Sequence, residues 1–139
     1  MEYVDLGLPS GTKWATCNIG ASTPSRAGID YLREEATVVA KQQGGYLPTK
    51  ADFVELLDYC HWREIDKDGM KGFCVVGRNG NSIYLAAIHD SGDIWLSDIG
   101  IVDDDEVPCL AIWVNADHEG SSWLPMGDNE KCAVRLVLK

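Results

Sequence analysis

Two short motifs place a histidine beside carboxylates, an arrangement that can orient an imidazole as a general base. They are His89-Asp90 and Asp117-His118-Glu119. A hydrolase would also need a nucleophile, and the chain has neither a Gly-x-Ser-x-Gly elbow nor a Cys/His signature. An acid beside a histidine does not form a triad without that nucleophile. We therefore expect no catalytic residue and no enzymatic activity.

Two acidic stretches contain the residue types that bind calcium. Glu64–Gly69 imitates the start of an EF-hand loop, but Val75 stands where calcium needs a bidentate Glu. Asp103–Glu106 offers carboxylates at successive positions, and side chains on an extended chain alternate between opposite faces. At most two of these carboxylates can converge on one ion. We therefore expect acidic surface turns, no bound metal and no cofactor.

The cysteines have no metal-binding or redox spacing. They are Cys17, Cys60, Cys74, Cys109 and Cys132. No C-x-x-C pair is present, which argues against zinc-ribbon and thioredoxin-like sites. The odd number leaves at least one thiol free. Cys74 and Cys132 lie inside apolar runs, as is typical of small buried hydrophobic residues.

The region after residue 88 interleaves tryptophans with short polar side chains, a composition suited to recognition of a sugar or a protein. Aromatic rings offer area to bury and polar groups set the orientation of a ligand. We expect Trp113, inside an apolar run, to be buried, and we expect loops within residues 88–130 to bind the ligand. The residues predicted to share one exposed face are Trp95, Asp98, Asn115, Asp117, His118 and Trp123.

Two helices are predicted in the first half of the chain. The first spans residues 25–43 and ends at Gly44-Gly45. Its apolar face holds Ile29, Leu32, Ala36, Val39 and Ala40. The second begins with a capping box formed by Thr49 and Asp52. Its apolar stripe, expected to be buried against a sheet, holds Phe53, Leu56, Leu57 and Cys60.

Extended segments surround these helices. Residues 72–76 and 81–87 flank Asn79-Gly80, which is a strong hairpin signal. Further extended segments are predicted over residues 3–8, 12–17, 94–97, 109–115 and 133–138. This order predicts an α+β fold with two helices packed on antiparallel sheets. No repeat or linker interrupts the pattern, so we expect a single domain over residues 1–139.

The runs 4–21, 44–57, 72–76, 79–85 and 134–137 follow the pattern of a known family, in order along the chain. They resemble the Fibrobacter succinogenes major paralogous domain, which is repeated many times in gut Bacteroidetes proteomes. The resemblance implies a C-type-lectin-like fold with adjacent N- and C-terminal strands, whose variable loops bind ligands without catalysis. Family members usually carry a longer aromatic-rich insertion after the Gly20-Ala21 position, so any function of that insertion does not carry over.

The same broader fold serves two other groups of proteins. Variable proteins of diversity-generating retroelements have hypervariable positions near the C-terminus. Formylglycine-generating enzymes share a segment similar to Leu47–Phe53 and bind copper through a close cysteine pair, whereas Cys109 and Cys132 are far apart in this sequence. The resemblance also makes Cys17, in the run 4–21, and Cys60, just after the run 44–57, candidates for a disulfide.

The net charge of −10 and the scattered basic residues argue against nucleic acid and anionic membrane surfaces as partners. No run approaches the ~18 apolar residues of a membrane span, and Met1–Asp5 lacks a signal-peptide pattern. We expect a secreted or cell-surface location if the domain is cut from an exported parent, and otherwise a cytoplasmic or phage-associated one.

These observations predict a non-catalytic domain that binds a protein or a glycan. The alternative is a structural or phage-associated interaction subunit, and a formylglycine-generating-type cysteine enzyme is a third and less favoured possibility. The sequence leaves the ligand and the oligomeric state open.

Overall fold

The computed structural model describes residues 2–26, 28–67, 69–86, 92–102, 105–113, 122–125 and 131–139. For residues 70–71, 86, 92–102, 105–113 and 122–125 it describes the backbone alone. The two helices of this part of the chain are α1 (Arg33–Gln42) and α2 (Lys50–Tyr59). The strands are β1 (Tyr3–Asp5), β2 (Lys13–Ala15), β3 (His61–Lys67), β4 (Met70–Val76), β5 (Ser82–Ala86), β6 (Gly92–Val102), β7 (Asp105–Trp113), β8 (Ser122–Pro125) and β9 (Val137–Leu138).

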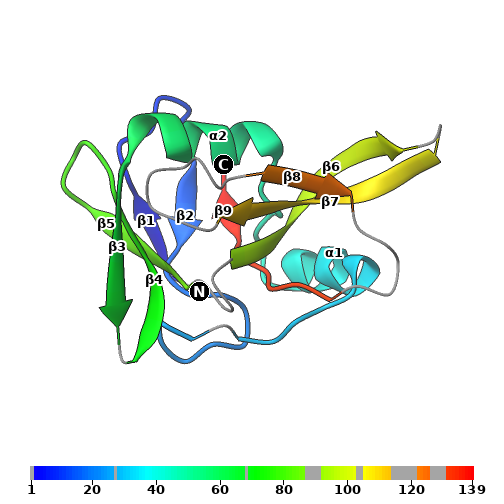
Figure 1. Cartoon of the computed structure of the whole chain (residues 1–139), viewed down its shortest axis with the longest axis horizontal. Coiled ribbons are helices and arrows are strands. Elements are labelled where there is room, and N and C mark those ends of the chain that lie inside the picture. The colour runs from blue at the N-terminus through cyan, green and yellow to red at the C-terminus, as the bar shows by residue number, and fades with distance from the viewer. Residues whose placement is uncertain are drawn as a thin grey trace.

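The described strands form three antiparallel sheets of three strands each, in the orders β1-β2-β9, β3-β4-β5 and β6-β7-β8 (Figure 1). The predicted α+β class with antiparallel sheets is confirmed. The predicted hairpin around Asn79-Gly80 is also confirmed, since β4 and β5 pair on either side of it.

The two ends of the chain meet in one sheet but do not pair with each other. Trp14 of β2 faces Val4 on one side and Val137 on the other. The sequence-based expectation of adjacent terminal strands is therefore corrected: β2 lies between β1 and β9. The reason is the turn after β1, closed by the Gly11 amide bonding the Leu8 carbonyl at 3.0 Å, which folds the N-terminus into a hairpin. The second strand of that hairpin then offers its free edge to β9.

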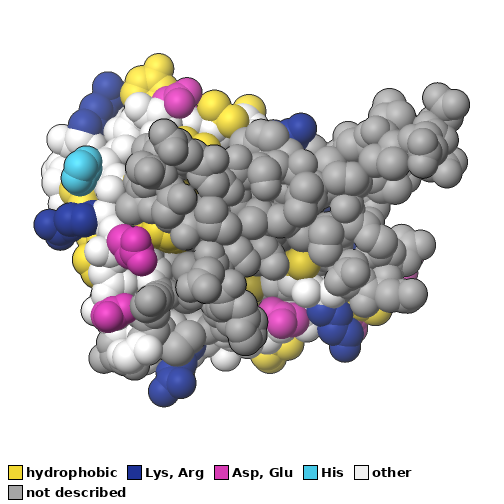
Figure 2. Space-filling model, viewed as in Figure 1, with side chains coloured by type: hydrophobic (Ala, Val, Ile, Leu, Met, Phe, Trp, Pro, Cys, Tyr) yellow, Lys and Arg dark blue, Asp and Glu magenta, His cyan; other side chains and the backbone are white. Residues whose placement is uncertain are grey.

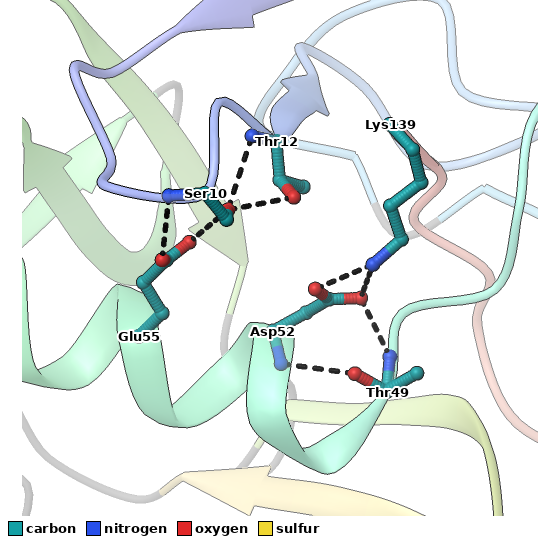
Figure 3. A network of polar contacts seen from close by, with 6 residues as sticks. All are labelled: Ser10, Thr12, Thr49, Asp52, Glu55 and Lys139. Atoms are coloured by element: carbon teal, nitrogen blue, oxygen red, sulfur yellow. Dashed lines mark hydrogen bonds and ion pairs between the residues drawn. The ribbon is translucent and has the colours of Figure 1, made fainter.

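Helix α2 begins as its sequence predicts. The Asp52 amide donates to the Thr49 hydroxyl at 3.0 Å, and the Thr49 amide donates to the Asp52 carboxylate at 2.9 Å. Figure 3 shows this capping box and the ion pair that Asp52 forms with the Lys139 ammonium. The Glu55 carboxylate accepts from the Ser10 hydroxyl at 2.7 Å. These contacts attach α2 to the turn between β1 and β2 and to the residue that follows β9.

The apolar side of α2 packs into a core that both neighbouring sheets share. Phe53 and Leu56 are fully buried, whereas Leu57 is only partly buried against this cluster. The Phe53 ring lies 6.4 Å from Trp14 and 6.0 Å from Trp62, measured between centroids in edge-on arrangements. Trp14 and Trp62 are thus packing residues of this core.

Helix α1 is shorter than predicted, beginning at Arg33 rather than at residue 25. The preceding chain is held by distant backbone partners instead: the Ile29 amide bonds the Ile19 carbonyl at 3.0 Å, and Tyr31 pairs with Cys132. Gly28 has φ of 76°, and a Cβ there would collide with the Ile19 carbonyl. Ile29, predicted on the apolar helix face, is consequently 51% exposed.

Four predictions about extended segments and turns need correction. Glu64–Lys67 was expected to form a solvated turn but lies in β3, where Glu64 pairs with Phe73 and Lys67 with Met70. Strands β6 and β7 are longer than the segments 94–97 and 109–115. The closing segment 133–138 is strand only at β9. Before β9, the carbonyls of Val134 and Leu136 accept from the amides of Ile19 and Ala15.

Candidate functional site

Half of the predicted ligand-binding residues fall on the third sheet. Trp95 and Asp98 belong to β6 and Trp123 belongs to β8. Asn115, Asp117 and His118 lie outside the described residues, as does His89-Asp90. The described part of residues 88–130 is a three-stranded sheet, which includes the predicted extended segment 94–97 and most of 109–115. The structure therefore places three of the six residues on one sheet and does not describe the other three.

The backbone register fixes how these positions relate to each other. Trp95 pairs with Leu110 of β7, and Trp123 pairs with Ala111, the next residue along the same strand. Asp98 lies where the β6–β7 register shifts, between Trp95 and Ile99. Bulges of this kind bend a strand and are frequent beside binding sites. Paired residues share a face of a sheet and successive residues alternate, so this register puts positions 95 and 123 on opposite faces. The expectation that all six residues share one face is corrected for this pair.

The hairpin of β6 and β7 extends beyond the rest of the described chain (Figure 1). Strand β8 pairs with β7 only at Cys109–Ile112. The outer part of the hairpin, where Ile99–Val102 pairs with Asp105–Pro108, is therefore a two-stranded ribbon. Among the described strands, β6 stands at the edge of this sheet.

A buried arginine joins segments of the other two sheets. Arg135 is fully buried, and its Nε donates to the Asn18 side-chain oxygen at 2.7 Å. Its other two nitrogens donate to the carbonyls of Ala15 and Tyr84, each at 2.8 Å. Burial lowers the pKa of Arg135 to about 10, while nearby Cys17 acts in the opposite direction. The guanidinium therefore stays charged at neutral pH and joins the β2 and β5 regions.

Sequence reasoning missed this role of Arg135. The available signal was one arginine within the otherwise apolar run Ala133–Leu138. Charged residues are almost never fully buried unless their donors are paired, and here each of three nitrogens has an oxygen partner.

The described cysteines Cys17, Cys60, Cys74 and Cys132 are free thiols, so the candidate disulfide between Cys17 and Cys60 is not formed. Burial, together with the Glu55 charge, raises the pKa of Cys60 to about 11. Within the described residues, no three His, Cys, Asp or Glu side chains group as a metal site. In the same part of the chain, no helix is long and apolar enough to span a membrane.

A cavity that the sequence did not reveal lies between α1 and the segment leading into α2. Its volume is about 360 Å³. The described residues that line it are Arg33, Thr37, Ala40, Lys41, Gly45, Tyr46, Leu47, Thr49 and Lys139. All of these residues except Lys139 come from residues 33–49, and the cavity forms where the chain turns back after α1 and meets the C-terminal residue.

On the face shown in Figure 2, the basic side chains of the described residues are dispersed and do not gather into one patch. Comparisons with known protein families, with curated proteins and with solved structures found no match for this chain.

Proposed function

We propose that this chain is a non-catalytic ligand-binding domain of C-type-lectin-like fold, which binds a protein or a glycan at the β6–β8 sheet and the segments joining its strands. The observation that carries the proposal is the β6–β7 hairpin, which extends from a framework closed by its own ends and by the buried Arg135. Binding residues concentrate on parts of a protein that can vary without disturbing the core.

The resemblance to the Fibrobacter succinogenes major paralogous domain supports the same division of roles. The family-like runs provide β1, β2, α2, β5 and the segment around Arg135. They include the core residues Leu6, Trp14 and Phe53, all fully buried. The family-like pattern thus supplies residues of the core. Residues 88–130 lie outside that pattern and can serve recognition.

The long edge strand favours a second candidate function, that of a structural interaction subunit. Among the described strands, β6 pairs with β7 alone, which leaves one edge of this 11-residue strand without a strand partner. Such an edge can accept a strand from another protein, with main-chain hydrogen bonds providing the affinity. Binding of this kind depends on the backbone of β6 more than on individual side chains.

A glycan array probed with single variants tests the main proposal. We expect Trp123→Ala and Asp117→Ala each to abolish binding and to leave the melting temperature nearly unchanged, as for surface sites away from packing features. Trp95→Ala is measured separately. Trp95 and Trp123 pair with consecutive residues of β7, which puts their positions on opposite faces of the sheet. Val38→Ala on α1, where Val38 is 54% exposed, is the matched control and should retain binding.

Two results would separate the candidates. A glycan bound by both variants but lost on substitutions in α1 would contradict the proposed site. A protein partner that tolerates Trp123→Ala and Asp117→Ala but is lost on placing proline at an outward-facing amide of β6 would favour the interaction subunit, since proline removes the donor that strand addition needs.

A further inference from the structure

The cavity beside α1 has one wall made by a single helix face. Arg33, Thr37, Ala40 and Lys41 are spaced by about one turn along α1, so their side chains project toward the same side. The facing wall is Gly45–Leu47, and Thr49 and Lys139 complete the lining. A volume of about 360 Å³ lies within the range of small-molecule sites in proteins.

The apolar part of this cavity is held by backbone bonds. The Tyr46 amide donates to the Val137 carbonyl at 3.0 Å, and the Val137 amide donates back at 2.9 Å. Behind this wall, a Cβ on Gly45 would lie 2.6 Å from the Tyr3 hydroxyl and 3.2 Å from the Leu136 Cβ, so any larger residue would require these side chains to shift. Leu47 is buried, whereas the Tyr46 side chain is 56% exposed. The wall is therefore fixed in position while it presents an accessible ring.

The charge of the lining is opposite to that of the molecule. The chain carries a net charge of −10 with 12 basic residues, yet three of those 12 line this cavity and no acidic residue is among its described lining. Two of the three already have partners: Lys139 pairs with Asp52 at 2.5 Å, and Arg33 interacts within the protein. None of the described contacts pairs the Lys41 ammonium, and this side chain is exposed in the last turn of α1.

We propose that this cavity binds a small amphipathic carboxylate, with its carboxylate paired to Lys41 and its apolar body packed against Tyr46 and Leu47. A carboxylate complements the positive charge of this lining, which differs from the net negative charge of the protein. The apolar body uses the area of the Tyr46 ring and the Leu47 side chain. This site is separate from the β6–β8 sheet and does not depend on the function proposed for that sheet.

Three probes separate the two parts of this recognition: 3-phenylpropionate, its neutral amide 3-phenylpropionamide, and acetate. Amide chemical shifts are followed in an NMR titration of the full chain. We expect 3-phenylpropionate to shift the signals of residues 41–47 and to bind roughly threefold to fivefold more tightly than the amide, the range of an exposed ion pair. Acetate should produce no saturable shift at the same concentrations.

Variants assign each part to its residue. Lys41→Gln should remove the preference for the acid over the amide, and Tyr46→Ala should weaken both probes to a similar extent. Arg63→Gln makes the same change in net charge at an exposed position of β3 outside the cavity lining, and it should leave binding unchanged. Lys41 and Tyr46 are both exposed, so the variants should remain folded.

Several outcomes would overturn the proposal. The first is that 3-phenylpropionate shifts no signal of residues 41–47. The second is that Lys41→Gln and Arg63→Gln weaken binding equally, which would assign the effect to net charge. The third is that Tyr46→Ala leaves both affinities unchanged, which would place the apolar body elsewhere.

Discussion

Replacing Arg135 by methionine should remove a large part of the free energy of unfolding. The arginine is fully buried, and it donates to oxygens of Asn18, Ala15 and Tyr84 at 2.7–2.8 Å. Methionine fills a similar volume but donates to none of them. Each of the three buried acceptors left without its partner costs ~1–3 kcal/mol. The variant no longer has to bury a charge, and this gain offsets part of the total cost. We therefore expect a net loss of about 3–5 kcal/mol.

The loss is measured by guanidinium chloride unfolding, followed by tryptophan fluorescence. Trp14 and Trp62 are suitable reporters because both are buried in the core shared with α2. A loss of this size should lower the melting temperature by roughly 10 °C in a domain of about this length. Arg63→Met, at an exposed position of β3, is the control and should change the free energy of unfolding by less than about 0.5 kcal/mol.

Arg135→Lys distinguishes the contribution of charge from that of geometry. Lysine retains a positive charge, but its single ammonium cannot reproduce the fork that reaches Asn18, Ala15 and Tyr84 together. We expect a loss close to that of Arg135→Met. A loss below about 1 kcal/mol for Arg135→Met would refute the reasoning, because the three oxygens would then have found other partners.

The remaining predictions concern α2. Leu56→Ala, at a fully buried position, should lower the free energy of unfolding by ~2–5 kcal/mol. Val54→Ala, where the side chain is 39% exposed, should cost well under half of that. Equal losses in denaturant unfolding would mean that the buried face of α2 is misassigned. The pKa of Cys60, raised to about 11, means that the folded state keeps this proton at a pH where the unfolded thiol has lost it. Stability should therefore be unaffected by Cys60 below pH ~9 and should fall as pH rises toward 11, and Cys60→Ala should flatten that fall; parallel pH profiles would contradict it.

Sequence patterns predicted α2 well because the interactions that form it are local. Thr49 and Asp52 are three residues apart, and their reciprocal hydrogen bonds need nothing from the rest of the chain. The start of α1 could not be predicted in the same way. The helical pattern continues through Ile29, but the amides of Ile29 and Tyr31 donate to the carbonyls of Ile19 and Cys132, and these distant bonds outweigh local preference.

The terminal strands show the same limit at the level of sheets. Alternation along residues 3–8 and 133–138 identified extended chain, but it carried no information about which edges would pair. That choice depended on the turn closed between Leu8 and Gly11, which placed β2 between the two ends. A strand pattern specifies the faces of a strand more directly than it specifies its neighbours.

The two candidate sites differ in how far sequence could lead to them. Trp95, Asp98 and Trp123 were selected by composition within one continuous stretch, and the structure assigns them to one sheet. The cavity beside α1 brings Lys41 and Lys139 to one lining although 97 positions separate them, and Asp52 keeps Lys139 there through its ion pair. Asp52 is thus both the capping residue that begins α2 and the anchor of one cation of the cavity. The first role follows from a three-residue pattern, whereas the second exists only because β9 returns the C-terminus to the start of α2.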